Sequence, residues 1–300
     1  MTGVQHAMGL FCSEAGVAYH QGQWWPIVPE LPDITVVAEE LARRATGREI
    51  ATATAPAPIL LRATDGDLAA LPGMTLGPAS HRGKFLLLPL LRGGREERLL
   101  LANPMLAGRF WLLDAPGEKV RARTGLRMTF TDGGELRYVD REMLGKLYFV
   151  QRENLDDIPG WAEMGPDADD PDLTLEAFRA RIRRHPGELK NLLRNQHFVA
   201  GIGNAYSDEI LWTARLAPLR KRRTLSPEEI DRLYEAMRSV LTEATLRLRD
   251  LVPPHIEVQH REFLQVHLRG GEPCPRCGKP LRQTGGAEAT TFCRSCQPPF

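Results

Sequence analysis

A chain of 300 residues with 42% hydrophobic content is long enough for two domains with ordinary cores. Its formal net charge of +1 excludes a protein that is basic all over, so a nucleic-acid partner would have to meet local patches, such as the basic stretches 179–194 and 220–223. No apolar run reaches the about 18 residues of a membrane span and no secretory leader is recognisable, which predicts a soluble, cytoplasmic protein.

The first 28 residues form an atypical leader without clear periodicity, and they hold the unpaired Cys12. A helix is predicted over residues 33–46. Asp33 is the expected N-cap, and Gly47 is the expected stop.

The next part of the chain is typical of β structure. "KFLLLPL" (84–90) and "RLLLANPM" (98–105) are apolar runs separated by a hairpin-like "LRGGREE". "LRMTFTDGGELRYV" (126–139) alternates apolar and polar residues around a turn at 132–134. These patterns predict a β domain over residues 29–150. The acidic stretch 151–172, rich in Pro and Gly, is predicted to be a linker.

Helices are predicted over 175–185, 187–195, 206–213 and 227–247, within a helical domain at 173–258. The stretch "KNLLRNQHFVAGIGNAYSDEILW" (190–212) places Gly201, Gly203 and Asn204 at the start of a helix. Free N–H groups and the helix dipole favour an anion such as a phosphate there, with Asn204 as the N-cap or as a donor to that anion. A tight turn between helices, capped by Asn204, explains the pattern equally well.

Four cysteines near the C-terminus have the spacing of a metal site. Two C-x2-C pairs, separated by fifteen residues, can present four thiolates to one structural Zn²⁺: Cys274, Cys277, Cys293 and Cys296. A pair of disulfides is the alternative, and it is disfavoured inside a cell. Residues 259–300 are therefore predicted to form a zinc finger that does not involve Cys12.

Four blocks of this chain resemble, in order, the formamidopyrimidine-DNA glycosylase and endonuclease VIII family of base-excision repair enzymes. They are "PELPDI" (29–34), "HRGKFLLL" (81–88), the segment 190–212 and the four cysteines. The resemblance implies an α+β multidomain fold: an N-terminal β-sandwich, a helix–two-turn–helix domain and a C-terminal zinc finger. It also implies a monomer that binds double-stranded DNA containing damaged bases or abasic sites.

The resemblance also assigns residues. Pro29 matches the family's N-terminal proline, whose amine attacks C1′ of a flipped-out nucleotide, forms a Schiff base and permits elimination at an abasic site. Glu30 matches an acid that moves protons at the sugar and the leaving base. The DNA contacts implied are Lys84, Met105, Lys190, Gly203 and Asn204. For Glu30 and Lys84 the alternative is a solvated surface position, and for Met105 it is the core.

Three positions depart from the family pattern. Glu142 and Leu144 stand where the family has an intercalating arginine and an aromatic wedge, and Glu288 replaces an arginine of the zinc finger. Arg276, Arg282 and Arg294 are candidates to compensate for that last change. The departures leave the predicted nucleophile intact but put activity on 8-oxoguanine in doubt.

The leader conflicts with the implied chemistry. While Val28 precedes Pro29, the proline nitrogen belongs to a tertiary amide and cannot attack carbon. We therefore predict that residues 1–28 are absent from the working protein, because translation starts at a valine codon for Val28 or because the leader is removed. The alternatives are a non-catalytic protein of the same fold that binds damaged DNA or abasic sites and, more distantly, an unrelated zinc-ribbon protein.

Overall fold

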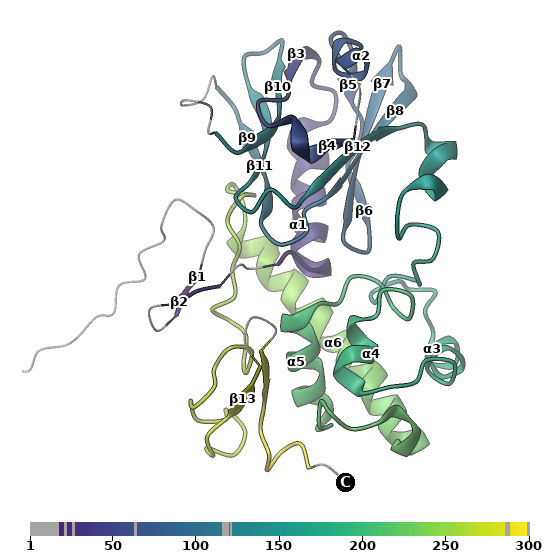
Figure 1. The fold of residues 1–300 in the computed structure, drawn as a ribbon, viewed down its shortest axis with the longest axis vertical. Coiled ribbons are helices and arrows are strands. Elements are labelled where there is room, and N and C mark those ends of the chain that lie inside the picture. The colour runs from purple at the N-terminus through teal and green to yellow at the C-terminus, as the bar shows by residue number, and fades with distance from the viewer. Residues whose placement is uncertain are drawn as a thin grey trace, which may run out of the picture.

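A computed structural model describes residues 18–20, 23–25, 28–62, 65–115, 120, 122–285 and 289–298. Two bodies stand one above the other, with the β-sheet domain at the top and most of the helices and the cysteine module below (Figure 1). Cys12 and Glu288 lie outside the described residues. Within the predicted leader, β1 (Ala18–His20) and β2 (Gln23–Trp25) form a short antiparallel hairpin that the sequence did not predict.

The upper domain is a sandwich of two sheets. One has the strand order β3 (Ile50–Thr54), β10 (Thr124–Phe130), β11 (Glu135–Asp140) and β9 (Gly108–Leu113). The other has the order β4 (Leu61–Arg62), β12 (Lys146–Val150), β8 (Arg95–Asn103), β7 (Phe85–Arg92) and β5 (Thr75–Leu76), and β6 (Ser80–Arg82) pairs with β7. Both predicted hairpins, β7–β8 and β10–β11, are confirmed as antiparallel pairs.

Helix α1 (Leu31–Ala45) begins two residues earlier than predicted, and the Asp33 N-cap prediction is wrong. Glu30 is the N-cap, and its backbone N–H donates to Asp33 Oδ2 at 2.8 Å. Pro32 fits within the first turn because the N–H that proline lacks would have no helical partner there. Gly47, at φ +83°, follows the helix end as predicted.

The predicted linker is packed against both domains. It contains a 3₁₀ turn, η2 (Arg152–Asp157), and its Leu155, Ile158 and Trp161 join a buried cluster with residues of β7, β8 and β12. Trp161 meets Phe85 edge to face at 5.6 Å between ring centroids. Ala168 is buried in the core of the helical domain. The sequence did not predict this packing, because the apolar residues of the segment have no regular spacing.

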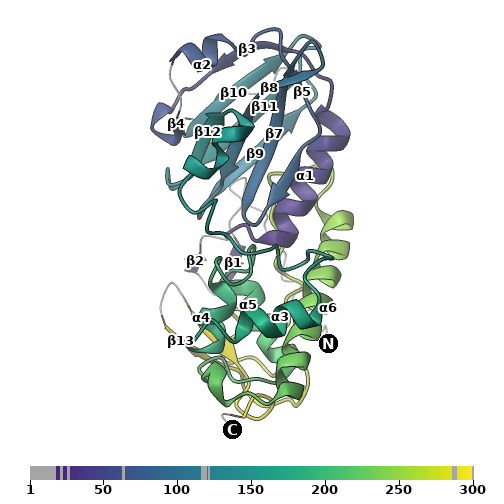
Figure 2. The same ribbon diagram turned by 90° about the vertical axis from the view of Figure 1, so that its right-hand side faces the viewer.

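The lower domain contains α3 (Leu175–Ile182), α4 (Leu189–Arg194), α5 (Asn204–Ala214) and α6 (Pro227–Leu251). Helix α6 has 25 residues, four more than predicted, and spans about 37 Å at 1.5 Å per residue. Its Leu233 and Leu241 lie in the helical core, whereas Leu248 lies in the sandwich core. Helices α1 and α6 run side by side at the junction (Figure 2).

Short elements complete the fold. They are η1 (Pro58–Leu60), α2 (Asp65–Ala69), η3 (Arg222–Thr224) and the hairpin β13 (Arg282–Thr284) with β14 (Thr290–Phe292). None of the helices in the described ranges has the length and apolar character needed to cross a bilayer.

Candidate active site

The N-terminal ends of α1 and α5 meet at the junction of the two domains. The Glu30 carboxylate accepts hydrogen bonds from the backbone N–H groups of Gly203 (2.5 Å), Ala205 (2.8 Å) and Tyr206 (3.3 Å). Glu30 is only 1% exposed, so the solvated alternative is wrong. The anion that the start of α5 holds in this structure is thus a protein carboxylate, and not an external phosphate.

The two glycines before α5 allow this contact. A Cβ at Gly203 would lie 2.5 Å from Glu30 Cδ and 2.7 Å from Lys84 Nζ. Gly201 has φ +98°, and its carbonyl accepts the Leu31 N–H at 3.0 Å. Any side chain at Gly203 would push the two charged groups away, so glycine is required there.

Lys84 lies in the turn between β6 and β7, and its ammonium group reaches the start of α5. Burial lowers its pKa below the usual lysine range, and the nearby Glu30 carboxylate opposes that shift. The Lys84 side chain is half-buried. It places a positive charge beside Glu30 and Gly203.

Pro29 is buried next to this charged pair. The carbonyl oxygen of Val28 accepts hydrogen bonds from Gln259 Nε2 and Arg261 Nη2, both at 3.2 Å. A cavity of about 40 Å³ adjoins Pro29 and is lined in part by Asp33, Arg109 and Gln259. Sequence reasoning missed Gln259 and Arg261, because no motif marks residues that reach Val28 from the other end of the chain.

The structure buries Lys190 at the contact between α4 and α5. Its side chain is 4% exposed, and its Nζ donates to Asp208 Oδ1 at 2.6 Å and to the carbonyl oxygen of Ala289 at 3.1 Å. Asp208 is also bound by His267 Nδ1 at 2.8 Å and by the Thr291 N–H at 3.1 Å. Lys190 therefore ties α4 to α5 and to the cysteine module, and in this geometry its ammonium group does not face a DNA backbone.

Asn204 is not the N-cap of α5, because Gly203 takes that position. Its Nδ2 donates to the carbonyl oxygen of Ala289 at 3.0 Å, the same oxygen that Lys190 contacts. The β13–β14 hairpin is therefore attached directly to the start of α5.

Met105 follows β8 at φ +50° and is 39% exposed, so the core alternative is wrong. The loop with the departures from the family pattern is tightly held. Asp140 Oδ1 accepts the N–H groups of Glu142 (2.9 Å) and Met143 (3.1 Å), and Leu144 is 48% exposed. Met105 and Leu144 both present apolar side chains to solvent.

The four predicted cysteine ligands converge, with all their Sγ atoms within 4.8 Å of one another. The Sγ–Sγ distances of 3.9 Å (Cys274 to Cys296) and 3.5 Å (Cys277 to Cys293) are far longer than the about 2.05 Å of a disulfide. They are close to the about 3.8 Å expected between thiolates around a tetrahedral metal with bonds of about 2.3 Å. The disulfide alternative is therefore wrong, and this thiol-only set fits a structural Zn²⁺.

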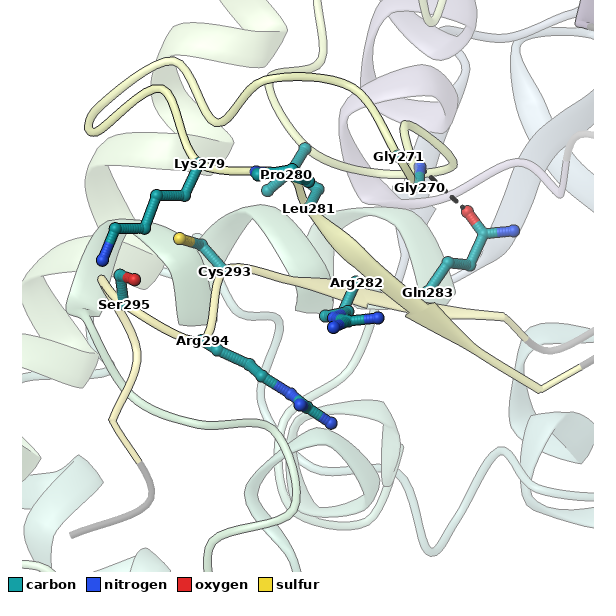
Figure 3. A pocket seen from close by; sticks show the side chains of 10 residues that line it. All are labelled: Gly270, Gly271, Lys279, Pro280, Leu281, Arg282, Gln283, Cys293, Arg294 and Ser295. Atoms are coloured by element: carbon teal, nitrogen blue, oxygen red, sulfur yellow. Dashed lines mark hydrogen bonds between the residues drawn. The ribbon is translucent and has the colours of Figure 1, made fainter.

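The cysteine module also carries a positively charged hollow of about 620 Å³ (Figure 3). Lys279, Arg282 and Arg294 line it, and both arginines are exposed. Arg282 reaches the hollow from β13, and Arg294 reaches it from the turn that follows β14. The hollow can accept an anion.

The structure combines a β-sandwich, a helix–two-turn–helix domain and a four-cysteine hairpin. These three parts converge on Pro29 and Glu30, and this combination defines a class of protein. Two family models match the chain. They are the "Formamidopyrimidine-DNA glycosylase N-terminal domain" over residues 28–147 and the "Formamidopyrimidine-DNA glycosylase H2TH domain" over residues 164–250. The chain belongs to the formamidopyrimidine-DNA glycosylase family.

Individual relatives agree. The chain is 33% identical to a formamidopyrimidine-DNA glycosylase of Bacillus cereus over 281 residues, covering 90% of this chain and 99% of the relative. The corresponding protein of Pelotomaculum thermopropionicum is 32% identical, with 90% and 99% covered. A crystal structure of Lactococcus lactis Fpg with DNA containing N7-benzyl-Fapy-dG is 26% identical, has a TM-score of 0.81, and is matched over 90% of this chain and 100% of that one.

A complex of the Lactococcus lactis protein with DNA containing an abasic site has a TM-score of 0.80 and 26% identity, with 90% of this chain and 99% of that one covered. The predicted fold class and family are confirmed, and the distant zinc-ribbon alternative is wrong. The family is one of DNA glycosylases of base-excision repair, and the two Lactococcus lactis structures hold damaged or abasic-site DNA.

Proposed function

We propose that the working protein begins at Pro29 and is a bifunctional DNA glycosylase and abasic-site lyase. The free proline nitrogen attacks C1′, and the damaged base leaves with the bonding electron pair and takes up a proton. The nitrogen then gives up its proton, its lone pair expels O4′ with the electron pair of the C1′–O4′ bond, O4′ takes up a proton, and an iminium ion between C1′ and the nitrogen remains. Removal of a C2′ proton then expels the 3′ phosphate, and a second elimination expels the 5′ phosphate.

The observation that carries this proposal is the position of Pro29. It lies directly before Glu30, whose carboxylate is fixed by three backbone N–H groups and approached by Lys84. A fixed negative charge beside the nitrogen stabilises the iminium cation, because it needs no reorganisation when the charge develops. Glu30 is also the proposed group that moves protons between the sugar and the leaving base.

We propose that Lys84 and Asn204 contact DNA phosphates near the lesion and that Arg282 and Arg294 contact phosphates further along the duplex. Met105 and Leu144 are the proposed apolar side chains that enter the gap left by the flipped nucleotide. Glu142 adds a negative charge to the loop with Leu144, so we propose a lesion preference different from that of family members with an arginine there. The proposed location is the cytoplasm, and the proposed state is a monomer.

Lys84→Ala is expected to weaken DNA binding about equally for all sequences and to lower the slope of log K against log salt by about one charge. Asn204→Ala should weaken binding and leave that slope unchanged, since the amide is neutral. Fluorescence anisotropy at four salt concentrations measures both. Arg95→Ala, an exposed position in the β7–β8 hairpin, is the control. A wild-type slope for Lys84→Ala would contradict the phosphate contact.

We propose that the metal at the four cysteines is zinc. Purified protein should contain about one zinc per chain, and the double variant Cys277→Ser, Cys293→Ser should contain almost none, because two ligands cannot hold a tetrahedral site. In the chain that keeps residues 1–28, Cys12→Ser is the matched control and should keep its zinc. Metal analysis by plasma mass spectrometry checks the content. Equal zinc in the double variant and the wild type would refute the assignment.

A further inference from the structure

The peptide bond between Val28 and Pro29 imitates a covalent intermediate of the proposed reaction, and the following inference rests on that proposed function. An amide nitrogen and an iminium nitrogen are both planar, with three substituents at similar angles. The carbonyl carbon of Val28 therefore occupies the position that C1′ of the sugar takes when it is bonded to the Pro29 nitrogen. C1′ of the iminium ion has already lost its oxygen, so the carbonyl oxygen of Val28 marks the side from which that oxygen leaves in the preceding step.

Two side chains are arranged to donate to that oxygen. Gln259 Nε2 and Arg261 Nη2 each lie 3.2 Å from the Val28 oxygen. The Gln259 amide is oriented by Arg109, whose Nη2 donates to Gln259 Oε1 at 2.5 Å. Arg261 is held by Asp33, with its Nη1 at 2.7 Å from Oδ1 and its Nη2 at 2.5 Å from Oδ2. Both donors are thus fixed by a second contact.

We propose that Gln259 and Arg261 are catalytic residues that hydrogen-bond to the oxygen on C1′ while the covalent link to Pro29 forms. On an abasic site, the proline nitrogen bonds to the aldehyde carbon C1′ and the π electron pair moves to O1′. A proton then passes from nitrogen to O1′ to give a neutral carbinolamine, O1′ takes up a second proton from solvent, and water leaves to give the iminium ion. On a base-bearing nucleotide the oxygen is O4′, which receives the electron pair of the C1′–O4′ bond as the ring opens.

The charge of Arg261 suits this role. Burial acts to lower its pKa, but the Asp33 carboxylate and Tyr206 outweigh burial and keep the pKa above the usual arginine range. The guanidinium group also lies over the Tyr206 ring, 5.1 Å from its centroid. A permanently charged donor that is already oriented stabilises developing negative charge on oxygen without reorganisation.

Gln259→Glu in the chain that begins at Pro29 tests the proposal. Glutamate keeps an acceptor for Arg109 and removes the N–H that reaches the oxygen. With saturating abasic-site DNA, the first-order rate of the borohydride-trapped adduct is expected to fall about 100-fold, as when one oxyanion donor is removed. Gln259→Leu, which adds no charge, should show a similar loss. Gln151→Glu, at an exposed position far along the chain, is the charge control.

The outcomes separate the two proposals. Wild-type trapping rates in both Gln259 variants would overturn the catalytic role and leave the proposed function standing. The role is also overturned if the rate falls only as far as the affinity for the DNA or the folded fraction falls, since that indicates a structural residue. If the wild-type chain beginning at Pro29 forms no adduct, the proposed function itself fails, and this inference fails with it.

Discussion

A chain that begins at Pro29 is expected to form a covalent adduct with abasic-site DNA under borohydride, and a chain that keeps residues 1–28 is expected to form almost none. The difference in initial rate should be at least about a thousandfold, because loss of a covalent nucleophile costs up to about 10⁶ in rate. The reason is electronic: the lone pair of an amide nitrogen is delocalised into the carbonyl group.

The position of Val28 adds a steric reason why the longer chain should form almost no adduct. Pro29 is buried, and the Val28 carbonyl occupies the donors Gln259 and Arg261, so the leader fills the place that the sugar needs. The matched control is a chain that begins at Val28, which differs from the active form by one residue. Its amine is displaced from the site by that residue, and it should trap DNA slowly.

Intact mass must accompany each assay, since removal of the leader during purification would activate the longer chain. An adduct from a chain whose mass includes residues 1–28 would mean that Pro29 is not the nucleophile. A missing adduct from the chain that begins at Pro29, with normal binding to abasic-site DNA, would favour the non-catalytic alternative. N-terminal sequencing of the native protein then tells which form the cell makes.

Local patterns were enough to predict much of the fold. The two hairpins, the helices around 190–212 and the convergence of four cysteines depend on residues that are close in sequence, where periodicity and turn chemistry decide the structure. The glycine pair at 201 and 203 was predicted to be either a phosphate site or a tight turn, and the anion that it holds is the Glu30 carboxylate. Its identity was missed because Glu30 lies 173 residues from Gly203 along the chain.

Other contacts were not predicted for the same reason. Lys190 was expected to face DNA, but its partner Asp208 is 18 positions away on another helix, and Ala289 is 99 positions away. Gln259 and Arg261 lie 231 and 233 positions from Val28. Contacts of this kind exist only after both domains have folded, so no pattern within a short window can indicate them.

Lys190→Met is expected to destabilise the protein strongly and to leave the salt dependence of DNA binding unchanged. The Lys190 side chain is 4% exposed and that of Asp208 is fully buried, so the substitution leaves a carboxylate buried without its ammonium partner. Breaking such a pair costs about 3–5 kcal/mol. At about 2–4 °C per kcal/mol for a chain of this size, the melting temperature should fall by about 6–20 °C.

Two further variants test whether the loss of stability comes from the buried ion pair between Lys190 and Asp208. The double variant Lys190→Met, Asp208→Asn removes both charges and should recover part of the loss, because no carboxylate is then left buried without its partner. Lys221→Met breaks an exposed ion pair with Glu188, at 2.9 Å with side chains 55% and 30% exposed, and should change stability by less than about 1 kcal/mol. Thermal melts measure all four proteins. A normal melting temperature for Lys190→Met, together with a salt slope reduced by about one charge, would show that Lys190 leaves Asp208 to contact a phosphate when DNA binds.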